Sequence, residues 1–441
     1  MTWARVSGAR VMVVAAVLLV PVGPALATTP PPAADDDTAV DAATTTSTVA
    51  GGVETTITVS DEVGYRDALA AASGDPSGPH TLVLEGDIVL GQCCAAGDDP
   101  RYDGSADLVI DGGGHVLDAG GSSRLLAVIA PSGTTVTIRD LALRNGRAAH
   151  DGGAVLVEGG AALSFEGVVV AESVAYSGDG GGVASDGTVA VVGSTFAGNH
   201  AVAGDGGAIH AARAFPVEGS TFTGNSARGG GALAVDDGAA LRNVTITGND
   251  GGHHGGGGLL ATGRADVILI EATVAGNRAP RGANIDVGDP DPTVVATALA
   301  DAGGGGTNCR GDAPIAAVDS FSDDASCGTR GWAGTDGADA RLGPLADNGG
   351  PTETMLPAPD SPLVDAIDPL AFWGGPTIAC TTWPDQRGVE RPRDGNGVPE
   401  TGGRTHGPFG PVDVWCDVGA VERDAPPGAP APVVAAPRFT G

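Results

Sequence analysis

The sequence predicts an all-β protein: a right-handed parallel β-helix solenoid with a short N-terminal capping helix and a disulfide-containing C-terminal cap domain. Three observations predict this fold. First, the pair Gly-Asn ends a short apolar strand four times, at spacings of 26, 24 and 28 residues. These asparagines are Asn199, Asn225, Asn249 and Asn277. Second, a Gly-Gly pair recurs between them with the same period. Third, an aromatic content of 4% fits the narrow core of stacked coils.

The N-terminal segment has the three parts of a secretory signal peptide, which we assign to residues 1–27. Arg5 and Arg10 precede an apolar run from Val11 to Val22, and Ala25-Leu26-Ala27 offers the cleavage site. The apolar run is too short to span a membrane comfortably, and no later segment is long enough. We therefore expect a secreted or extracellular surface-associated protein without a transmembrane segment in the mature chain.

Composition divides the rest of the chain into four parts. Residues 28–52 are rich in Thr, Ala, Pro and Asp, and we predict a disordered leader there because little apolar surface is available for burial. Residues 53–300 carry the repeats and form the parallel β-helix. Residues 301–423 complete and cap the solenoid, and residues 424–441 form a Pro/Ala-rich tail.

Individual elements follow from local patterns along the chain. Residues 65–72 have helical composition, and a helix there would cover the strand edges of the first coil, which would otherwise aggregate. Residues 81–90, 107–112 and 135–145 are predicted to form early, less regular coils. Later coils show alternating apolar residues, which indicate strands with one buried face.

The repeated Gly and Asn residues have a structural interpretation. Gly at one phase of every coil permits a positive φ in a corner where a Cβ atom would clash. Asn tolerates the same left-handed conformation, and stacked Asn side chains can hydrogen-bond to the backbone of the next coil. We therefore assign no binding role to the four repeated asparagines.

The charge of the chain restricts its partners. The formal net charge is −31, from 54 acidic and 23 basic residues, and every basic residue is Arg. Without a basic patch to neutralise phosphates, the protein is not expected to bind nucleic acid. An acidic surface suits solubility outside the cell or binding of Ca²⁺, and plain solvated charge is the favoured explanation.

Six cysteines in an exported chain indicate disulfides. We predict the pairs Cys309–Cys327 and Cys380–Cys416, because each pair lies within one local region of the C-terminal part. The adjacent Cys93 and Cys94 could bridge to each other, pair elsewhere or stay free, and sequence alone does not decide connectivity.

Two sets of motifs resemble known families. Gly-Gly-Ala followed by Ser-Thr-Phe-x-Gly-Asn resembles polymorphic outer membrane protein repeats. The C-terminal motifs resemble the choice-of-anchor Q domain, and the likeness spans nearly all of residues 60–422. These motifs are Asn308-Cys309, Leu342–Thr352, Ser361–Asp365, Asp385–Gly388 and Cys416–Ala420. The resemblance implies exported, surface-associated β-helices with no established activity; how this chain is anchored stays open.

One column of carboxylates is a candidate site. Asp151, Asp179 and Asp205 each precede a Gly-Gly pair, with Arg228 and Asp250 at a similar phase in the next two coils. Stacked in this way, the three aspartates could bind Ca²⁺ or raise a carboxyl pKa. Alternatively, Asp simply favours turns, as Asn and Gly do.

Two further groups of residues have simpler interpretations. His253 and His254 lack a third ligand at a telling spacing, so we assign no metal site to them. In the C-terminal region we expect Arg387 to pair with a carboxylate such as Asp417.

Two classes of function fit this sequence. The first is a non-catalytic secreted or cell-surface β-helix that contacts glycans, the cell envelope or other proteins. The second is a Ca²⁺-dependent polysaccharide lyase or glycoside hydrolase of the same architecture, which rests on the aspartate column and on analogy of fold. No known lyase or hydrolase motif set is present, which favours the first. The sequence does not determine the oligomeric state.

Overall fold

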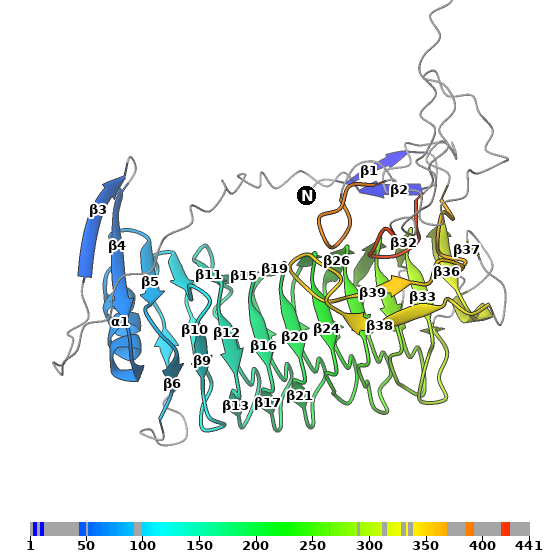
Figure 1. Ribbon diagram of the computed structural model, residues 1–441. Coiled ribbons are helices and arrows are strands. Elements are labelled where there is room, and N and C mark those ends of the chain that lie inside the picture. The colour runs from blue at the N-terminus through cyan, green and yellow to red at the C-terminus, as the bar shows by residue number, and fades with distance from the viewer. Residues whose placement is uncertain are drawn as a thin grey trace, which may run out of the picture. The chain divides into compact units, whose positions relative to one another are not determined.

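The computed structural model describes residues 3–6, 9–12, 44–49, 52–91, 99–263, 265–288, 292–310, 315–327, 332–333, 338–367, 384–391 and 416–423. The chain divides into two compact units, residues 1–40 and 41–441. In the first unit, β1 (Trp3–Val6) pairs antiparallel with β2 (Ala9–Met12), within the predicted signal peptide, which stays a prediction. The second unit is a parallel β-solenoid, as predicted (Figure 1).

Each coil passes through three long sheets, named sheets 1, 2 and 3 in the order in which a coil visits them. Sheet 1 contains β7 (Arg101–Tyr102), β10 (Leu126–Ile129), β14 (Val155–Glu158), β18 (Val183–Ser185), β22 (Ile209–Ala211), β25 (Leu233–Val235), β28 (Leu259–Ala261), β31 (Ile285–Val287) and β34 (Cys309–Arg310). Sheet 2 contains β3 (Thr44–Val49), β4 (Gly52–Val59), β5 (His80–Leu84), β8 (Leu108–Asp111), β11 (Thr135–Arg139), β15 (Ala162–Glu166), β19 (Val189–Val192), β23 (Phe215–Glu218), β26 (Gly238–Arg242), β29 (Asp266–Ile270), β32 (Thr293–Val295) and β35 (Ala316–Val318). Its β3 strand lies inside the predicted leader.

Sheet 3 contains β6 (Ile88–Val89), β9 (Val116–Asp118), β12 (Ala142–Arg144), β16 (Val169–Ala171), β20 (Thr195–Ala197), β24 (Thr221–Thr223), β27 (Thr245–Thr247), β30 (Thr273–Ala275), β33 (Ala298–Ala300), β36 (Ser320–Ser322) and β37 (Trp332–Ala333). Between sheets 3 and 1, a short sheet adds β13 (Arg147–Ala148), β17 (Val174–Ala175) and β21 (His200–Ala201). The turn that leads from this short sheet to sheet 1 in each coil is called the corner.

The register of the sheets places like residues above one another. In sheet 1, Val155, Val183, Ile209 and Leu233 pair one coil apart, and all are fully buried. Parallel pairing at about 4.8 Å per coil makes such columns continuous, so the apolar residues of successive coils form one core.

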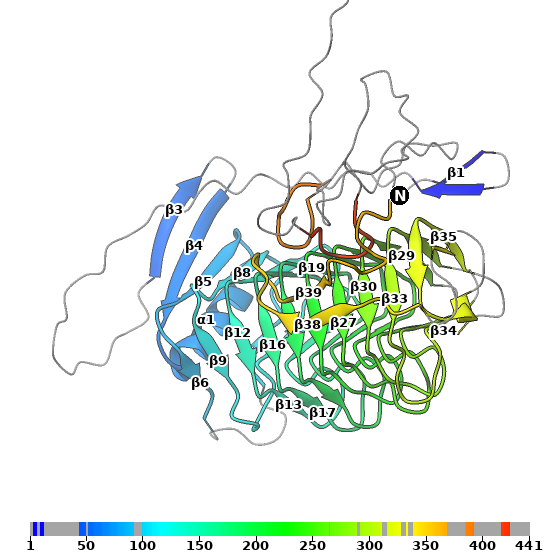
Figure 2. The same cartoon turned by 45° about the vertical axis from the view of Figure 1, so that its right-hand side comes forward.

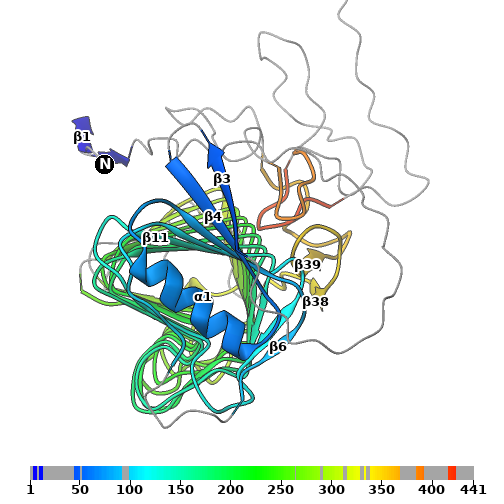
Figure 3. The same ribbon diagram turned by 90° about the vertical axis from the view of Figure 1, so that its left-hand side faces the viewer.

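Helix α1 (Glu62–Gly74) lies across the first end of the solenoid, as the sequence predicts (Figure 3). Asp61 is its N-cap, and the carboxylate accepts a hydrogen bond from the Gly64 N–H at 2.8 Å. Tyr65 and Leu69 are buried in the solenoid core, and the Tyr65 hydroxyl donates to the Leu125 carbonyl at 3.2 Å. Among the described residues, no helix is long and apolar enough to cross a membrane.

The repeated asparagines form a buried ladder, as predicted. The Oδ1 atom of Asn225 accepts the backbone N–H of Asn199 at 2.9 Å, and Asn249 does the same for Asn225 at 2.9 Å. The Asn225 Nδ2 atom donates to the Phe196 carbonyl at 3.0 Å. Each side chain thus satisfies backbone groups of a neighbouring coil that water cannot reach.

The left-handed positions differ from the prediction in one respect. The repeated asparagines do not have a positive φ; the glycine before each of them does, for example Gly224 with a φ of 64°. In the first two coils of this column the position belongs to Asn145 and Glu172, with φ values of 55° and 56°. The left-handed turn therefore lies at the glycine, one residue before each asparagine of the ladder. Asn225 itself keeps an ordinary backbone conformation while its side chain bonds to the neighbouring coil.

The described C-terminal segments cover the outer side of sheet 3, a placement that the sequence does not predict. There, β38 (Leu342–Ala346) and β39 (Thr354–Pro357) form an antiparallel pair that lies alongside the coils (Figures 1 and 2). The buried Gln386 amide accepts from the Thr245 hydroxyl at 2.7 Å and donates to the Thr221 hydroxyl at 2.9 Å. The Ala420 N–H donates to the Thr273 hydroxyl at 3.0 Å. Residues far apart in sequence therefore share this face.

One predicted disulfide is present, between Cys309 in β34 and Cys327 in the 3₁₀ turn η1 (Ala325–Cys327), with Cα atoms 5.0 Å apart. Cys416 is disulfide-bonded too. Cys380, Cys93 and Cys94 lie outside the described residues, so the pairing of Cys380 with Cys416 stays a prediction.

Candidate functional site

The predicted aspartate column exists and lies at the corner. The backbone N–H of Asp179 donates to Oδ1 of Asp151 at 2.7 Å, and the N–H of Asp205 donates to Oδ1 of Asp179 at 2.7 Å. One oxygen of Asp151 and of Asp179 thus binds the backbone of the next coil. This part of the column is a polar ladder parallel to the asparagine ladder, which supports the turn interpretation.

The column ends at Asp205, whereas the sequence predicts Arg228 and Asp250 at a similar phase in the next two coils. In the next coil Gly229 takes the aspartate position, since the carbonyls of Asp205 and Gly229 accept from Gly180 and Gly206 in the same way. Arg228 lies one residue earlier, and Asp250 bridges to Ser226 in another column. The sequence spacing predicts the wrong column for Asp250 because the number of residues per coil varies.

The carboxylates of the column do not converge. Calcium requires six to eight oxygen ligands around one point. In Asp151 and Asp179, however, one carboxylate oxygen already accepts a hydrogen bond from a backbone N–H. Among the described residues, no group of three or more His, Cys, Asp or Glu side chains could hold a metal ion. We therefore derive no chemical step through Ca²⁺, and its binding to Asp151, Asp179 and Asp205 stays a prediction.

A histidine that sequence reasoning missed lies on the outer face of sheet 1. His210 stands in β22, in register with Ala184 and Ala234 of the neighbouring strands. Its Nε2 atom lies 3.5 Å from Oδ2 of Asp236, and the other oxygen of Asp236 accepts from the Thr262 hydroxyl. Its small neighbours leave part of the imidazole accessible. The sequence signal that could have revealed it is a histidine at the repeat position where the preceding and the following coil have alanine.

The electrostatic surroundings of His210 favour its protonated form. Burial lowers the pKa of His210, but the hydrogen bond to Asp236 and the charges of Asp179 and Asp151 outweigh burial and raise the pKa above its usual value. In return, the hydrogen bond from His210 lowers the pKa of Asp236. The aspartate column therefore acts on His210 through its charge, and the pair can supply a charged hydrogen-bond donor at this surface.

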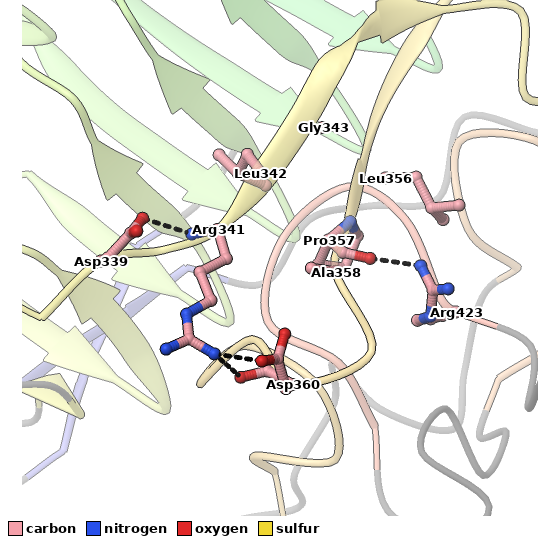
Figure 4. Close-up of a pocket in the computed structure, with 9 residues that line it drawn as sticks. All are labelled: Asp339, Arg341, Leu342, Gly343, Leu356, Pro357, Ala358, Asp360 and Arg423. Carbon is pink, nitrogen blue, oxygen red and sulfur yellow. Dashed lines mark hydrogen bonds and ion pairs between the residues drawn. The ribbon is translucent and has the colours of Figure 1, made fainter.

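An open hollow of about 560 Å³ lies beside β38 and β39 (Figure 4). Two arginines line it, and both guanidinium groups are already engaged. Arg341 pairs with Asp360, and Arg423 donates to the Pro357 carbonyl. Its lining contains two carboxylates and no His, Cys, Ser or Thr. Asp360 pairs with Arg341, and Asp339 accepts the Arg341 backbone N–H at 2.8 Å. None of the predicted site residues lies there.

A buried cluster of charges joins the C-terminal segments to the solenoid. The Arg391 side chain lies between Glu422, at 3.1 Å, and Glu271, at 3.8 Å, and all three side chains are at most 1% exposed. Neither carboxylate oxygen of Glu271 has a hydrogen-bond partner. Burial outweighs the charge of Arg391 and raises the pKa of Glu271 to about 7. Burial and the charge of Glu422 also raise the pKa of Asp417.

The expected pairing of Arg387 with Asp417 is wrong. Arg387 pairs with Asp385 at 2.8 Å, within the same turn. The Asp417 carboxylate instead accepts the backbone N–H groups of Asp365, at 2.8 Å, and Arg423, at 2.7 Å. Pairing with Asp385, two residues away, costs little conformational entropy because no long loop has to close, and this favours Asp385 over Asp417 as the partner of Arg387.

No family model matches this chain, and no curated protein or solved structure is significantly similar to it.

Proposed function

We propose that this protein is a secreted or cell-surface β-solenoid without catalytic activity, which contacts glycans, cell-envelope components or other proteins through its long outer faces. The observation that carries this proposal is the outer face of sheet 2, which is exposed at several coils although the described C-terminal segments reach it at Val295. The C-terminal segments pack on sheet 3, whereas Pro216 and Ala240 of sheet 2 are exposed and Val192 is 37% exposed. A flat face that repeats coil after coil suits an extended ligand.

The location outside the cell rests on sequence features. Residues 1–27 have the pattern of a signal peptide, and the Cys309–Cys327 disulfide suits an oxidising compartment. The C-terminal motifs that resemble the choice-of-anchor Q domain support the same placement, and the Gly-Asn repeats resemble those of polymorphic outer membrane proteins.

A panel of glycans and cell-envelope fractions tests the proposal. The purified full chain should bind at least one member of the panel, and neither reducing ends nor unsaturated products should accumulate. Binding to no member would contradict the proposal. Product that forms with the wild-type protein and disappears with Asp179→Asn would also contradict it.

The pair His210–Asp236 favours a second candidate function, cleavage of a polysaccharide by a lyase or hydrolase. A protonated imidazole can donate a proton to a leaving group. This alternative predicts products that are lost with His210→Gln while binding persists. If Ca²⁺ takes part, chelation should abolish the products and added Ca²⁺ should restore them.

A further inference from the structure

Three arginines without ion pairs lie at or beside the corner, within three successive coils. Most described Arg side chains pair with a carboxylate. The described arginines that form no such pair are Arg144, Arg147, Arg213, Arg228, Arg278, Arg281 and Arg423. Of these, Arg278 and Arg281 stand in one coil and Arg228 stands two coils earlier, all at or beside the corner, and we call them the arginine row.

Backbone hydrogen bonds fix the order of the row. The His254 N–H donates to the Arg228 carbonyl at 2.7 Å, which places His254 one coil beyond Arg228. The Arg281 guanidinium donates to the His254 carbonyl at 3.1 Å, which places Arg281 one coil further. Arg278, in the same coil as Arg281, bridges in parallel to Asp250. With coils about 4.8 Å apart, Arg228 is offset along the solenoid axis by about 10 Å from Arg278 and Arg281.

Two of the three guanidinium groups are held in place by the protein. Arg228 donates to the Ala203 carbonyl at 3.2 Å and to Nε2 of His253 at 3.2 Å. Arg281 is held by the His254 carbonyl. Side chains that are already ordered lose less conformational entropy when a ligand binds.

The nearby carboxylates are engaged with other groups. Asp205 hydrogen-bonds to His254 at 2.9 Å, and Asp250 accepts the Gly252 N–H at 2.9 Å. The buried Asp286 pairs with Arg310 at 2.9 Å. None of them lies within ion-pair distance of the arginine row, although burial raises the pKa of Asp286 and the charge of Arg281 opposes this rise. The guanidinium groups therefore keep hydrogen-bond donors for an external anion.

We propose that the arginine row binds the carboxylates of a linear acidic polysaccharide that lies along the solenoid axis. This inference rests on the proposed function, because it names the class of glycan and the place where it binds. A planar guanidinium matches a carboxylate in shape and charge. The net charge of −31 repels a polyanion from most of the surface, so an acidic chain should bind only where arginines without ion pairs gather.

Polygalacturonate is a suitable probe, and its methyl ester is a matched neutral control with the same backbone. The full chain should bind polygalacturonate at low salt, and should bind the ester more weakly by at least about tenfold. Binding should weaken steeply as salt rises from about 0.01 M to about 1 M.

Variants locate the site. The triple substitution Arg228→Gln, Arg278→Gln and Arg281→Gln should weaken polygalacturonate binding by about tenfold or more, whereas replacing all three by Lys should retain most of it. A control with Gln at Arg144, Arg147 and Arg213 removes the same charge from other exposed positions and should bind within about twofold of wild type. Circular dichroism verifies that each variant is folded.

The two proposals can fail separately. Equal binding of the acid and the ester, or equal binding by the two Gln triples, would overturn the arginine row while leaving a glycan-binding solenoid in place. Absence of binding to polygalacturonate and to every other member of the panel would overturn both.

Discussion

At Glu271 a left-handed backbone, with a φ of 52°, coincides with complete burial and with a carboxylate that has no hydrogen-bond partner. An ionised side chain in such surroundings is destabilising, because Arg391 at 3.8 Å compensates only part of the lost hydration. The protonated form avoids that penalty. The charge of this one residue therefore links the stability of the C-terminal packing to pH.

The pKa of Glu271, raised by burial to about 7 from its ordinary 4.5, fixes the direction of this link. Below 4.5 both folded and unfolded states are protonated and the stabilising contribution is complete; it is lost as pH rises to about 7. We expect Glu271→Gln to match wild type near pH 4.5 and to be more stable near pH 8 by about 3 kcal/mol. Urea unfolding across this range measures the difference. Glu166→Gln, at an exposed position, is the control and should change little; a Glu271→Gln variant that is equally destabilised at both pH values would refute the link.

Asp179 separates the structural and the calcium interpretations of the column. Its Oδ1 accepts the backbone N–H of Asp205, and an amide oxygen can do the same. We expect Asp179→Asn to retain the wild-type thermal midpoint, and Asp179→Ala to lose about 1 kcal/mol because the acceptor is removed. Calorimetry with Ca²⁺ and with a chelator checks this expectation. A wild-type midpoint that rises with Ca²⁺, and no longer does so in Asp179→Asn, would favour the metal site.

At the scale of elements, the described segment around Gln386 (residues 384–391) attaches the C-terminal segments to the outer side of sheet 3. Its amide joins Thr221 of β24 to Thr245 of β27, and all three residues are buried. We expect Gln386→Ala to leave these hydroxyls without their partner and to cost about 1–3 kcal/mol. Hydrogen exchange should then rise in β24 and β27 while sheet 1 stays protected. Unchanged exchange in sheet 3 would show that the C-terminal segments are held by other contacts.

At the scale of the whole molecule, the net charge of −31 destabilises the folded state through self-repulsion. Salt screens this repulsion, so the thermal midpoint should rise between about 0.01 M and about 0.15 M NaCl. An uncharged osmolyte at the same osmolality is the control for non-electrostatic effects. A midpoint that falls over this range would mean that the ion pairs outweigh the repulsion.

The sequence determines the coil, because each coil is stabilised by contacts with its immediate neighbours and these contacts recur with the repeat. The asparagine ladder, the first three positions of the aspartate column, helix α1 and the Cys309–Cys327 disulfide could all be predicted in this way. Two predictions within the repeat failed by an offset: Asp250 lies in another column because coil lengths vary, and the left-handed position lies one residue before each repeated asparagine. Outside the repeat, Arg387 pairs with Asp385 instead of Asp417.

Only the tertiary structure decided what lies against the coils. Gln386 meets Thr221 and Arg391 meets Glu271 across more than a hundred residues of chain, and such contacts have no period that a sequence could display. The pairing of His210 with Asp236 and the gathering of the arginine row depend on the register of successive coils, since a shift of one residue would turn a side chain to the opposite face. The repeat therefore encodes the scaffold, while the three-dimensional register decides which polar side chains meet on its surface.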